Sequence, residues 1–222
     1  MICMGRSALR LYKATGDERY EKACRRLTEQ LRHQPTTPEG GFWHKKLYPE
    51  QMWLDGIYMA CPFLTEFAVT FGEMQWADLA AKQMELIFEK TRLESGLHAH
   101  AWDSAKAQKW ADPRTGLSPH VWGRAMGWFV MAHADVLAAL PESHPDYAQL
   151  SLQMKSLLTA VMAARGADKL WHQVMDRPES EENYAESSCS AMFIYGLAKG
   201  KALGLCGAKE EAAARESMDA LW

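Results

Sequence analysis

The sequence has no stretch that approaches the roughly 20 consecutive apolar residues needed to span a bilayer. Its first residues, "MICMGRSALRLYK", lack the apolar core and the small-residue cleavage site of a signal peptide. The 222 residues carry a net charge of −3 at pH 7, and the basic side chains are scattered rather than gathered in a patch. These absences favour a cytoplasmic protein that binds neither membranes nor nucleic acid.

Cysteine is scarce, and its pattern excludes two common uses. The five cysteines are odd in number and far apart, and no two of them are spaced as Cys-x-x-Cys. This pattern predicts reduced thiols in the core rather than a disulfide framework or a zinc site. The residues are Cys3, Cys24, Cys61, Cys189 and Cys206.

Tryptophan and histidine are abundant by contrast, with nine and eight residues. Several of them gather in short segments that resemble loops rather than along one face of a helix. Aromatic and imidazole rings in such segments are typical of a pocket that stacks on a flat, polar ligand.

The hydrophobic pattern predicts an all-α protein. Apolar residues recur at spacings of three and four residues through eight segments, and no segment shows the sustained alternation of a strand. Helix-ending residues follow several of these segments, among them Gly16, Gly72, Pro141 and Gly207. The eight segments are residues 8–15, 19–31, 60–72, 76–91, 123–141, 147–164, 187–204 and 209–221.

The segments group in four pairs that form a repeat of roughly 50 to 65 residues. The first helix of each pair is apolar and rich in small residues, as expected of a buried inner helix, and the second is amphipathic, as expected of an outer one. Segments rich in His and Trp follow the outer helices, so we expect them on one rim, around a central pocket. The whole chain, residues 1–222, is predicted to be a single domain.

Asp55 is the first candidate for chemistry, because it lies within the apolar run "MWLDGIYMA". One hypothesis is a structural acid that a neighbouring Arg, Lys or backbone group satisfies. The other is a carboxylic acid whose pKa is raised by apolar surroundings, so that it can deliver a proton near neutral pH. We expect Pro49 in the first turn of its helix, which would place Asp55 one or two turns further along.

Two segments before inner helices could bind a ligand. "GFWHKK" places Trp43 beside His44 and Lys45, a combination that suits an anionic sugar but is also found in ordinary exposed loops. "GLHAHAWD" places His98 and His100 two residues apart. Such a pair can bind a metal ion, but no further His or Cys cluster stands at ligand spacing, so polar contacts to a sugar are favoured and no metal site is predicted.

A third segment, "WGRAMGW", opens an inner helix with Trp122, Arg124 and Trp128. An arginine among apolar neighbours needs an anion, which is either Asp55 in a structural ion pair or the carboxylate of a substrate. Gly123 and Gly127 weaken a helix, so close packing or the approach of a ligand is needed to explain them.

These residues lie in four segments that resemble a known family: "GGFWHKKLYPEQMWLDGIYMACPFLTEFA", "HAWD", "WADPRTGLSPHVWGRAMGWFVMAHADVL" and "ESSCSAMFIYGLAKG". They are similar to the unsaturated rhamnogalacturonyl hydrolases of glycoside hydrolase family 105, which are related to the unsaturated glucuronyl hydrolases of family 88. The resemblance implies an (α/α)6 toroid of helical hairpins that acts on pectin fragments ending in a 4,5-unsaturated galacturonate linked to rhamnose.

The reaction that the resemblance implies is hydration of the 4,5 double bond without a cofactor or a metal. One Asp protonates C4, the ring oxygen stabilises the resulting cation, the same Asp helps water to add at C5, and the hemiketal collapses to a keto acid. Asp55 matches the proton donor in "MWLDG". The residues that match the uronate pocket are His44, Lys45, His100, Trp122, Arg124 and Trp128.

The chain also departs from the family. The family has a second Asp before an Asn-Pro-Gly-Arg-like run, which here reads "ICMGR" at the start of the sequence, and the pattern gives about four hairpins of six. We therefore expect a shortened family member whose exposed inner-helix flank is covered by a second copy. Its activity could be reduced or lost, and the alternative hypothesis is a non-catalytic remnant that at most binds acidic sugars or self-associates. An epimerase on the same toroid is a third hypothesis.

Overall fold

The computed structural model describes residues 2–222, and within them the chain forms eight α-helices and two short strands. The prediction of an all-α protein is confirmed. The helices are α1 (Met4–Thr15), α2 (Glu18–Arg32), α3 (Leu54–Phe71), α4 (Gln75–Thr91), α5 (Gly123–Ala139), α6 (Tyr147–Ala163), α7 (Ser187–Ala202) and α8 (Ala208–Leu221), and the strands are β1 (Gln51–Trp53) and β2 (Ala101–Asp103).

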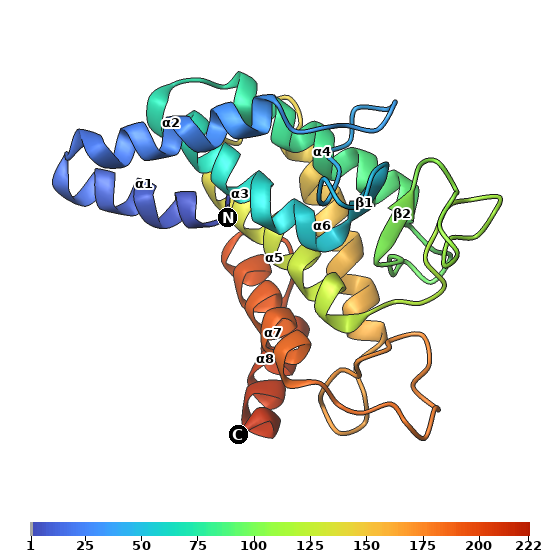
Figure 1. The fold of residues 1–222 in the computed structure, drawn as a ribbon. Coiled ribbons are helices and arrows are strands. Elements are labelled where there is room, and N and C mark those ends of the chain that lie inside the picture. Colours follow the sequence, from blue (N-terminus) through green and yellow to red (C-terminus); the bar gives the residue numbers. More distant parts are fainter. Residues whose placement is uncertain (1) are drawn as a thin grey trace.

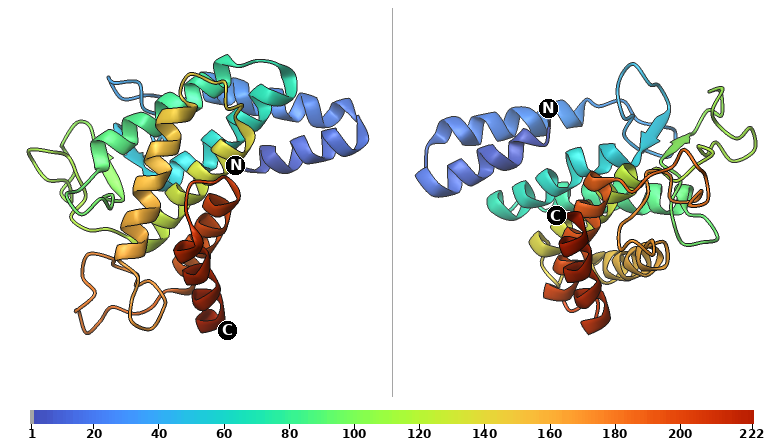
Figure 2. Two further views of the ribbon diagram at one scale, coloured as in Figure 1. Left: turned by 180° about the vertical axis from the view of Figure 1, so that it is seen from behind. Right: turned by 90° about the horizontal axis from the view of Figure 1, so that it is seen from below.

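The helices form four hairpins in this part of the chain, and Figure 1 shows them one after another along an arc. Each odd-numbered helix packs against the even-numbered helix that follows it, and α1, α3, α5 and α7 also pack against one another in that order. The views in Figure 2 show the α1–α2 hairpin at one side of the arc and the α7–α8 hairpin at the other. The odd-numbered helices are therefore the inner ones, as the repeat predicted.

Local sequence explains where these helices begin and end. The first inner helix stops at Gly16 and the second at Gly72, which adopt φ values of +69° and +71° that favour glycine. The Asp17 carboxylate accepts the backbone N–H of Arg19 and so caps the start of α2. No helix in residues 2–222 has the length and apolar character needed to cross a membrane.

Gly123 and Gly127 are explained by the close contact between α5 and α7. A Cβ atom at Gly123 would lie 2.7 Å from the carbonyl oxygen of His172 and 2.9 Å from Sγ of Cys189. At Gly127 it would lie 2.6 Å from Sδ of Met192. Both separations are too short for a real side chain, so the two glycines let the inner helices approach each other.

The two strands join the segments that precede successive inner helices. β1 and β2 are antiparallel, with Met52 opposite Trp102, and the backbone N–H of Leu54 donates to the carbonyl oxygen of His100 at 3.0 Å. A further bridge pairs Trp122 with Val174. These pairings bring the segments before α3, α5 and α7 to one rim of the arc, where the His- and Trp-rich stretches were predicted to meet.

Candidate active site

Asp55 is the second residue of α3, directly after β1. The expected position of Pro49 was wrong, because the helix begins at Leu54 and Pro49 lies in the turn before β1. The pairing of β1 with β2 accounts for this, since it keeps residues 51–53 extended until the helix starts. Asp55 is thus in the first turn, at the rim, even though the expected start of the helix was incorrect.

Asp55 is half-buried, and the Oδ2 atom of its carboxyl group is fully buried. Its Oδ2 atom makes no hydrogen bond with any residue between 2 and 222, and no ion pair joins Asp55 to the described residues. Burial raises the pKa of this carboxyl, while its own backbone N–H and the positive charges of Arg124 and Lys45 oppose the rise. A buried acid with a raised pKa can hold a proton close to the pH at which it is needed.

His44 lies over the same turn of α3 and belongs to a group of parallel rings. Its imidazole is stacked on the indole of Trp53 at 4.5 Å between centroids, and Trp53 is parallel to Tyr48 at 5.2 Å. A Cβ atom at Gly56 would lie only 3.1 Å from Nδ1 of His44, so glycine permits this close approach. Burial lowers the pKa of His44 to about 4, helped by Lys45 and His100, so the ring is neutral near pH 7.

His100 continues this aromatic group toward α5. Its ring meets Trp53 edge-on at 5.3 Å and Trp122 edge-on at 5.8 Å. Burial lowers the pKa of His100 as well. His98 is elsewhere: it is fully buried in the core beside Phe88, and its Nδ1 atom lies 2.9 Å from Oγ1 of Thr91. The two histidines therefore do not form one ligand-binding pair.

Arg124 is a half-buried cation at the start of α5. Its Cζ atom lies 4.2 Å from the centre of the Trp122 ring, and its side chain is 41% exposed. Within the described residues its ion-pair partner is Glu186, at 3.8 Å, and not Asp55. The structural ion pair between Arg124 and Asp55, one of the two predicted alternatives, is therefore wrong, and the guanidinium is available to an external anion.

The remaining two predicted site residues are Lys45 and Trp128, which lie at the edge of the group formed by His44, Trp53, His100 and Trp122. Lys45 lies with its Nζ atom 5.4 Å from the centre of the Tyr48 ring. Trp128 packs against Tyr58 at 4.7 Å, and the Tyr58 hydroxyl accepts a hydrogen bond from Arg6. Tyr48, Tyr58 and Glu186 were not predicted as site residues. The position of Glu186 at the start of the "ESSCSAMF" segment could have pointed to it, since that segment opens an inner helix.

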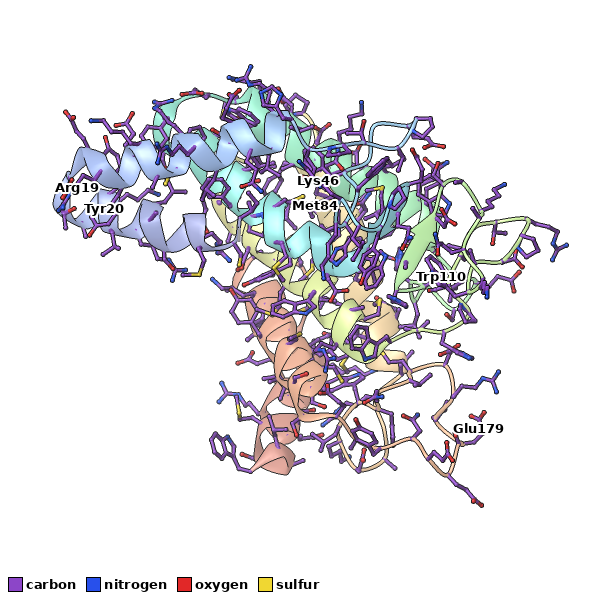
Figure 3. The ribbon with its side chains drawn as sticks, in the orientation of Figure 1. Arg19, Tyr20, Lys46, Met84, Trp110 and Glu179 are labelled. Carbon is purple, nitrogen blue, oxygen red and sulfur yellow. The ribbon has the colours of Figure 1, made fainter. Side chains whose placement is uncertain are left out.

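A cavity of about 390 Å³ adjoins this site between α2, the segment before β1 and the first turns of α3. It shares His44, Lys45, Trp53 and Gly56 with the site, while Asp55 is not part of its lining. Lys46, labelled in Figure 3, also lines it. The rim thus combines a half-buried acid, flat rings, cations and a concave surface, which together suit an anionic sugar.

Comparison with known proteins shows relatives that are similar in sequence. Protein Atu3128 of Agrobacterium fabrum is 37% identical over 156 residues, which are 70% of this chain and 66% of that protein. The unsaturated rhamnogalacturonyl hydrolase YesR of Bacillus subtilis is 29% identical over 205 residues, 88% of this chain and 56% of that protein.

Solved structures agree with these sequence relatives. A family 105 glycoside hydrolase of C. acetobutylicum superposes with a TM-score of 0.94 at 39% identity, over 97% of this chain and 61% of that one. The unsaturated glucuronyl hydrolase of Bacillus sp. GL1 shares the fold, with a TM-score of 0.72 at 17% identity over 97% of this chain. The chain spans between about half and two thirds of the length of these relatives.

These likenesses confirm the resemblance to families 105 and 88 and the toroid-type arrangement of hairpins. The family model described as Glycosyl Hydrolase Family 88 matches residues 1–222. The chain belongs to glycosyl hydrolase family 88.

Proposed function

We propose that this glycoside hydrolase acts on unsaturated galacturonyl-rhamnose oligosaccharides from pectin by hydrating the 4,5 double bond of the uronate. The observation that carries the proposal is the half-buried Asp55 carboxyl at the rim, which has a raised pKa and a buried Oδ2 atom without a hydrogen-bond partner among residues 2–222. An acid in this state can donate a proton, whereas a salt-linked carboxylate cannot do so readily. The relative YesR is named an unsaturated rhamnogalacturonyl hydrolase, which supports the choice of substrate.

In this proposal Asp55 serves as the general acid and then as the general base of the reaction. Asp55 gives its proton to C4 of the uronate, and the positive charge that develops is shared with the ring oxygen. The ionised Asp55 then accepts a proton from the water that adds at C5, so one carboxyl serves first as acid and then as base. The resulting hemiketal opens, which breaks the glycosidic bond and releases the rhamnose end.

Binding depends on charge and on flat surfaces. Arg124 and Lys45 are the cations that face the uronate carboxylate, and Trp122 and Trp128 supply apolar ring surfaces for the sugar. His44 and His100 are held neutral by burial and therefore add no further charge near pH 7. Their ring nitrogens are available to hydrogen-bond sugar hydroxyl groups.

The test is to incubate the purified chain with an unsaturated galacturonyl-rhamnose disaccharide and to follow the ultraviolet absorbance of the double bond. We expect the absorbance to fall, and we expect Asp55→Asn to slow this fall by about 10² to 10⁴-fold, the usual contribution of a general acid. Asp219→Asn, the same change on the outer helix α8, is the matched control and should retain full activity.

Two results would contradict the proposal. A constant absorbance together with measurable binding of the disaccharide would favour the alternative of a non-catalytic sugar-binding protein. Interconversion of sugars with unchanged unsaturation would favour an epimerase.

We also propose that a second copy of the chain covers the inner-helix flank of α1. The side chains of Met4 and Leu11 are 63% and 44% exposed there, which is unusual for an inner helix. The groove between α1 and α2 is bordered by Arg19, Lys22 and Arg26, whereas α8 carries more acidic than basic residues. Light scattering should show a dimer or larger species that Met4→Lys dissociates, and a monomer at all concentrations would contradict this.

A further inference from the structure

The guanidinium group of Arg124 is held in place without a hydrogen bond to any other side chain between residues 2 and 222. It lies 4.2 Å from the centre of the Trp122 ring, which restricts it on one side. Its ion-pair partner within residues 2–222 is Glu186, with 3.8 Å between Nη1 and Oε1, which is longer than a hydrogen bond. The N–H groups of Arg124 therefore donate no hydrogen bond to the described side chains, although Trp122 and Glu186 orient the guanidinium.

Glu186, in contrast, is firmly fixed. Its side chain is 13% exposed and caps the start of α7, where it accepts the backbone N–H of Cys189 at 2.6 Å and the hydroxyl of Ser188 at 2.7 Å. These hydrogen bonds outweigh the effect of burial and lower the pKa of Glu186, so the carboxylate stays ionised near neutral pH. A fixed negative charge therefore faces a cation on the neighbouring inner helix.

The 3.8 Å separation between Arg124 and Glu186 determines what the guanidinium can bind. Arginine carries five N–H donors in a planar fork, and a bidentate carboxylate at hydrogen-bond distance would occupy two of them. Such a partner would compete with any carboxylate that enters the site. A carboxylate at 3.8 Å attracts the guanidinium but leaves its donors free.

We propose that Glu186 is a positioning residue for substrate binding, which holds Arg124 against Trp122 so that the free guanidinium donors meet the carboxylate of the uronate. This inference rests on the proposed function, because it requires a substrate with a carboxylate. Glu186 does not touch the reacting atoms in this arrangement. It acts through Arg124, and it lowers the entropy that Arg124 loses when the substrate binds.

The decisive variant is Glu186→Gln, because its amide oxygen can still accept the N–H of Cys189 and keep the cap while the charge is lost. Ordering one long side chain costs roughly 0.5–1.5 kcal/mol, so we expect KM for the unsaturated disaccharide to rise by about 2- to 12-fold. We expect kcat to stay within about twofold of the wild type, because Asp55 is unchanged. Ser188→Ala removes a hydrogen bond from the same carboxylate but keeps its charge, and it is the matched control, with an unchanged KM.

A double-mutant cycle shows whether the effect passes through Arg124. In an Arg124→Gln background, Glu186→Gln should have no further effect on binding, because the group that it positions is gone. Equal effects of Glu186→Gln in both backgrounds, a fall in kcat with an unchanged KM, or a tighter KM would each overturn the inference.

Titration of the disaccharide by tryptophan fluorescence separates this inference from the proposed function, because it measures binding without turnover. If the chain binds the disaccharide without consuming the double bond, and Glu186→Gln weakens that binding only when Arg124 is present, the positioning role holds and the hydration proposal fails. If the wild-type chain does not bind the disaccharide at all, the positioning role is wrong.

Discussion

Asp55 and Asp135 are both carboxylic acids on neighbouring inner helices, but their surroundings differ. Asp135 on α5 is 5% exposed and accepts hydrogen bonds from Arg6 at 2.7 Å and from the hydroxyl of Tyr195. Arg6 also pairs with Glu66 at 2.6 Å, so this cluster joins α1, α3, α5 and α7. Asp55, by contrast, has a buried Oδ2 atom with no hydrogen-bond partner in the described part of the chain, residues 2–222.

The difference separates structural charge from functional charge. A buried ion is costly unless it is paired, so partners surround an acid that serves the fold. An acid that must exchange a proton with a substrate cannot be locked in this way. The cost of leaving Asp55 unpaired is therefore consistent with a role in chemistry, whereas Asp135 has the partners expected of a residue that holds four helices together.

The largest expected effect comes from breaking the cluster around Asp135. Arg6→Met leaves the Asp135 and Glu66 carboxylates without their cation, and loss of one partner of a buried pair typically costs about 3–5 kcal/mol. We expect the free energy of unfolding, measured by urea denaturation, to fall by this order. Asp55→Asn is the matched comparison and should leave stability unchanged or slightly raised at pH 7, because it removes a carboxylate whose ionisation burial disfavours. A marked loss of stability in Asp55→Asn would show that Asp55 is structural after all.

The second prediction concerns the pH dependence of stability. Burial lowers the pKa of His44 to about 4 and that of His98 to about 3, below the ordinary value of 6.5. Below pH 6.5 these histidines are protonated in the unfolded chain but stay neutral in the folded chain. The free energy of unfolding therefore falls as the pH drops from 6.5 toward the folded-state pKa values. Each such histidine contributes a slope of up to about 1.4 kcal/mol per pH unit.

Denaturation series between pH 7 and pH 4 test this prediction. His98→Gln should flatten the acid slope, because one group that gains a proton on unfolding is removed. His33→Gln at the exposed end of α2 is the comparison variant, because it makes the same substitution outside the core. Equal slopes in the wild type and His98→Gln would contradict the assignment of His98 as a buried neutral ring.

Tyr195→Phe is expected to have a smaller effect, since it removes one partner of Asp135 and leaves Arg6 in place. A hydrogen bond to a charged group contributes about 1.5–3 kcal/mol, which sets the expected loss of unfolding free energy. Tyr184→Phe in the exposed loop before α7 is the control, because that side chain is 54% exposed. If both variants lose the same stability, the Asp135 cluster does not hold the inner helices together.

The sequence predicted the helices and their pairing well, because the apolar periodicity of long helices is a strong local signal. Residues 147–164 and 187–204 were expected to be helical, and α6 and α7 occupy nearly these positions. The start of α3 was missed because the strand pairing of residues 51–53 with 101–103 is a contact between distant segments, which local periodicity does not contain.

The sequence predicted which residues lie at the site better than it predicted the contacts between them. Histidine, tryptophan and arginine near inner-helix starts pointed to His44, His100 and Arg124, and the structure places these at the same rim as Asp55. That Arg124 pairs with Glu186 rather than with Asp55 depends on how α5 packs against α7. The sequence also suggested that His98 and His100 act together, but only the fold shows that His98 is in the core.

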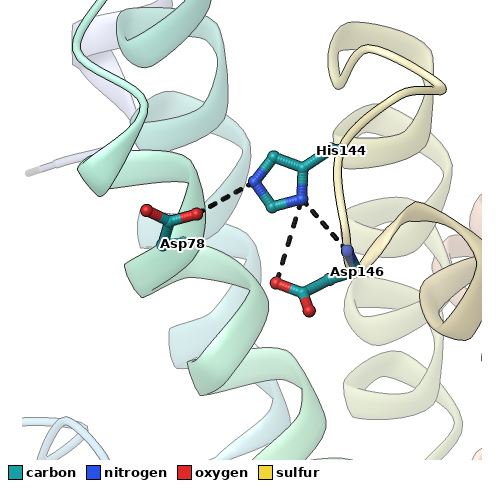
Figure 4. A group of neighbouring side chains, drawn as sticks. All are labelled: Asp78, His144 and Asp146. Carbon is teal, nitrogen blue, oxygen red and sulfur yellow. Dashed lines mark hydrogen bonds and ion pairs between the residues drawn. The ribbon is translucent and has the colours of Figure 1, made fainter.

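The smallest expected effect is at the opposite rim, where His144 lies between Asp78 and Asp146 (Figure 4). Its side chain is 3% exposed, its Nε2 atom lies 3.1 Å from the Asp78 carboxylate, and its Nδ1 atom accepts the backbone N–H of Asp146. Both ring nitrogens therefore have hydrogen-bond partners, whereas the buried Nδ1 of His44 has none within residues 2–222. The cluster of Asp78, His144 and Asp146 therefore resembles the Asp135 cluster, in which the polar groups are paired and serve the fold.

Asp78→Asn should lower the free energy of unfolding by less than about 1 kcal/mol, because Asp78 is 62% exposed and its amide replacement can still accept the hydrogen bond from Nε2. The hydrolysis rate should be unchanged, since the cluster joins α4 to the α5–α6 loop, away from the segments that carry the site. Thermal unfolding and the absorbance assay on the same preparation measure both quantities. A variant that keeps its stability but loses activity would mean that satisfied histidines also serve the site, and the distinction between paired and unpaired groups would then fail as a guide to function in this fold.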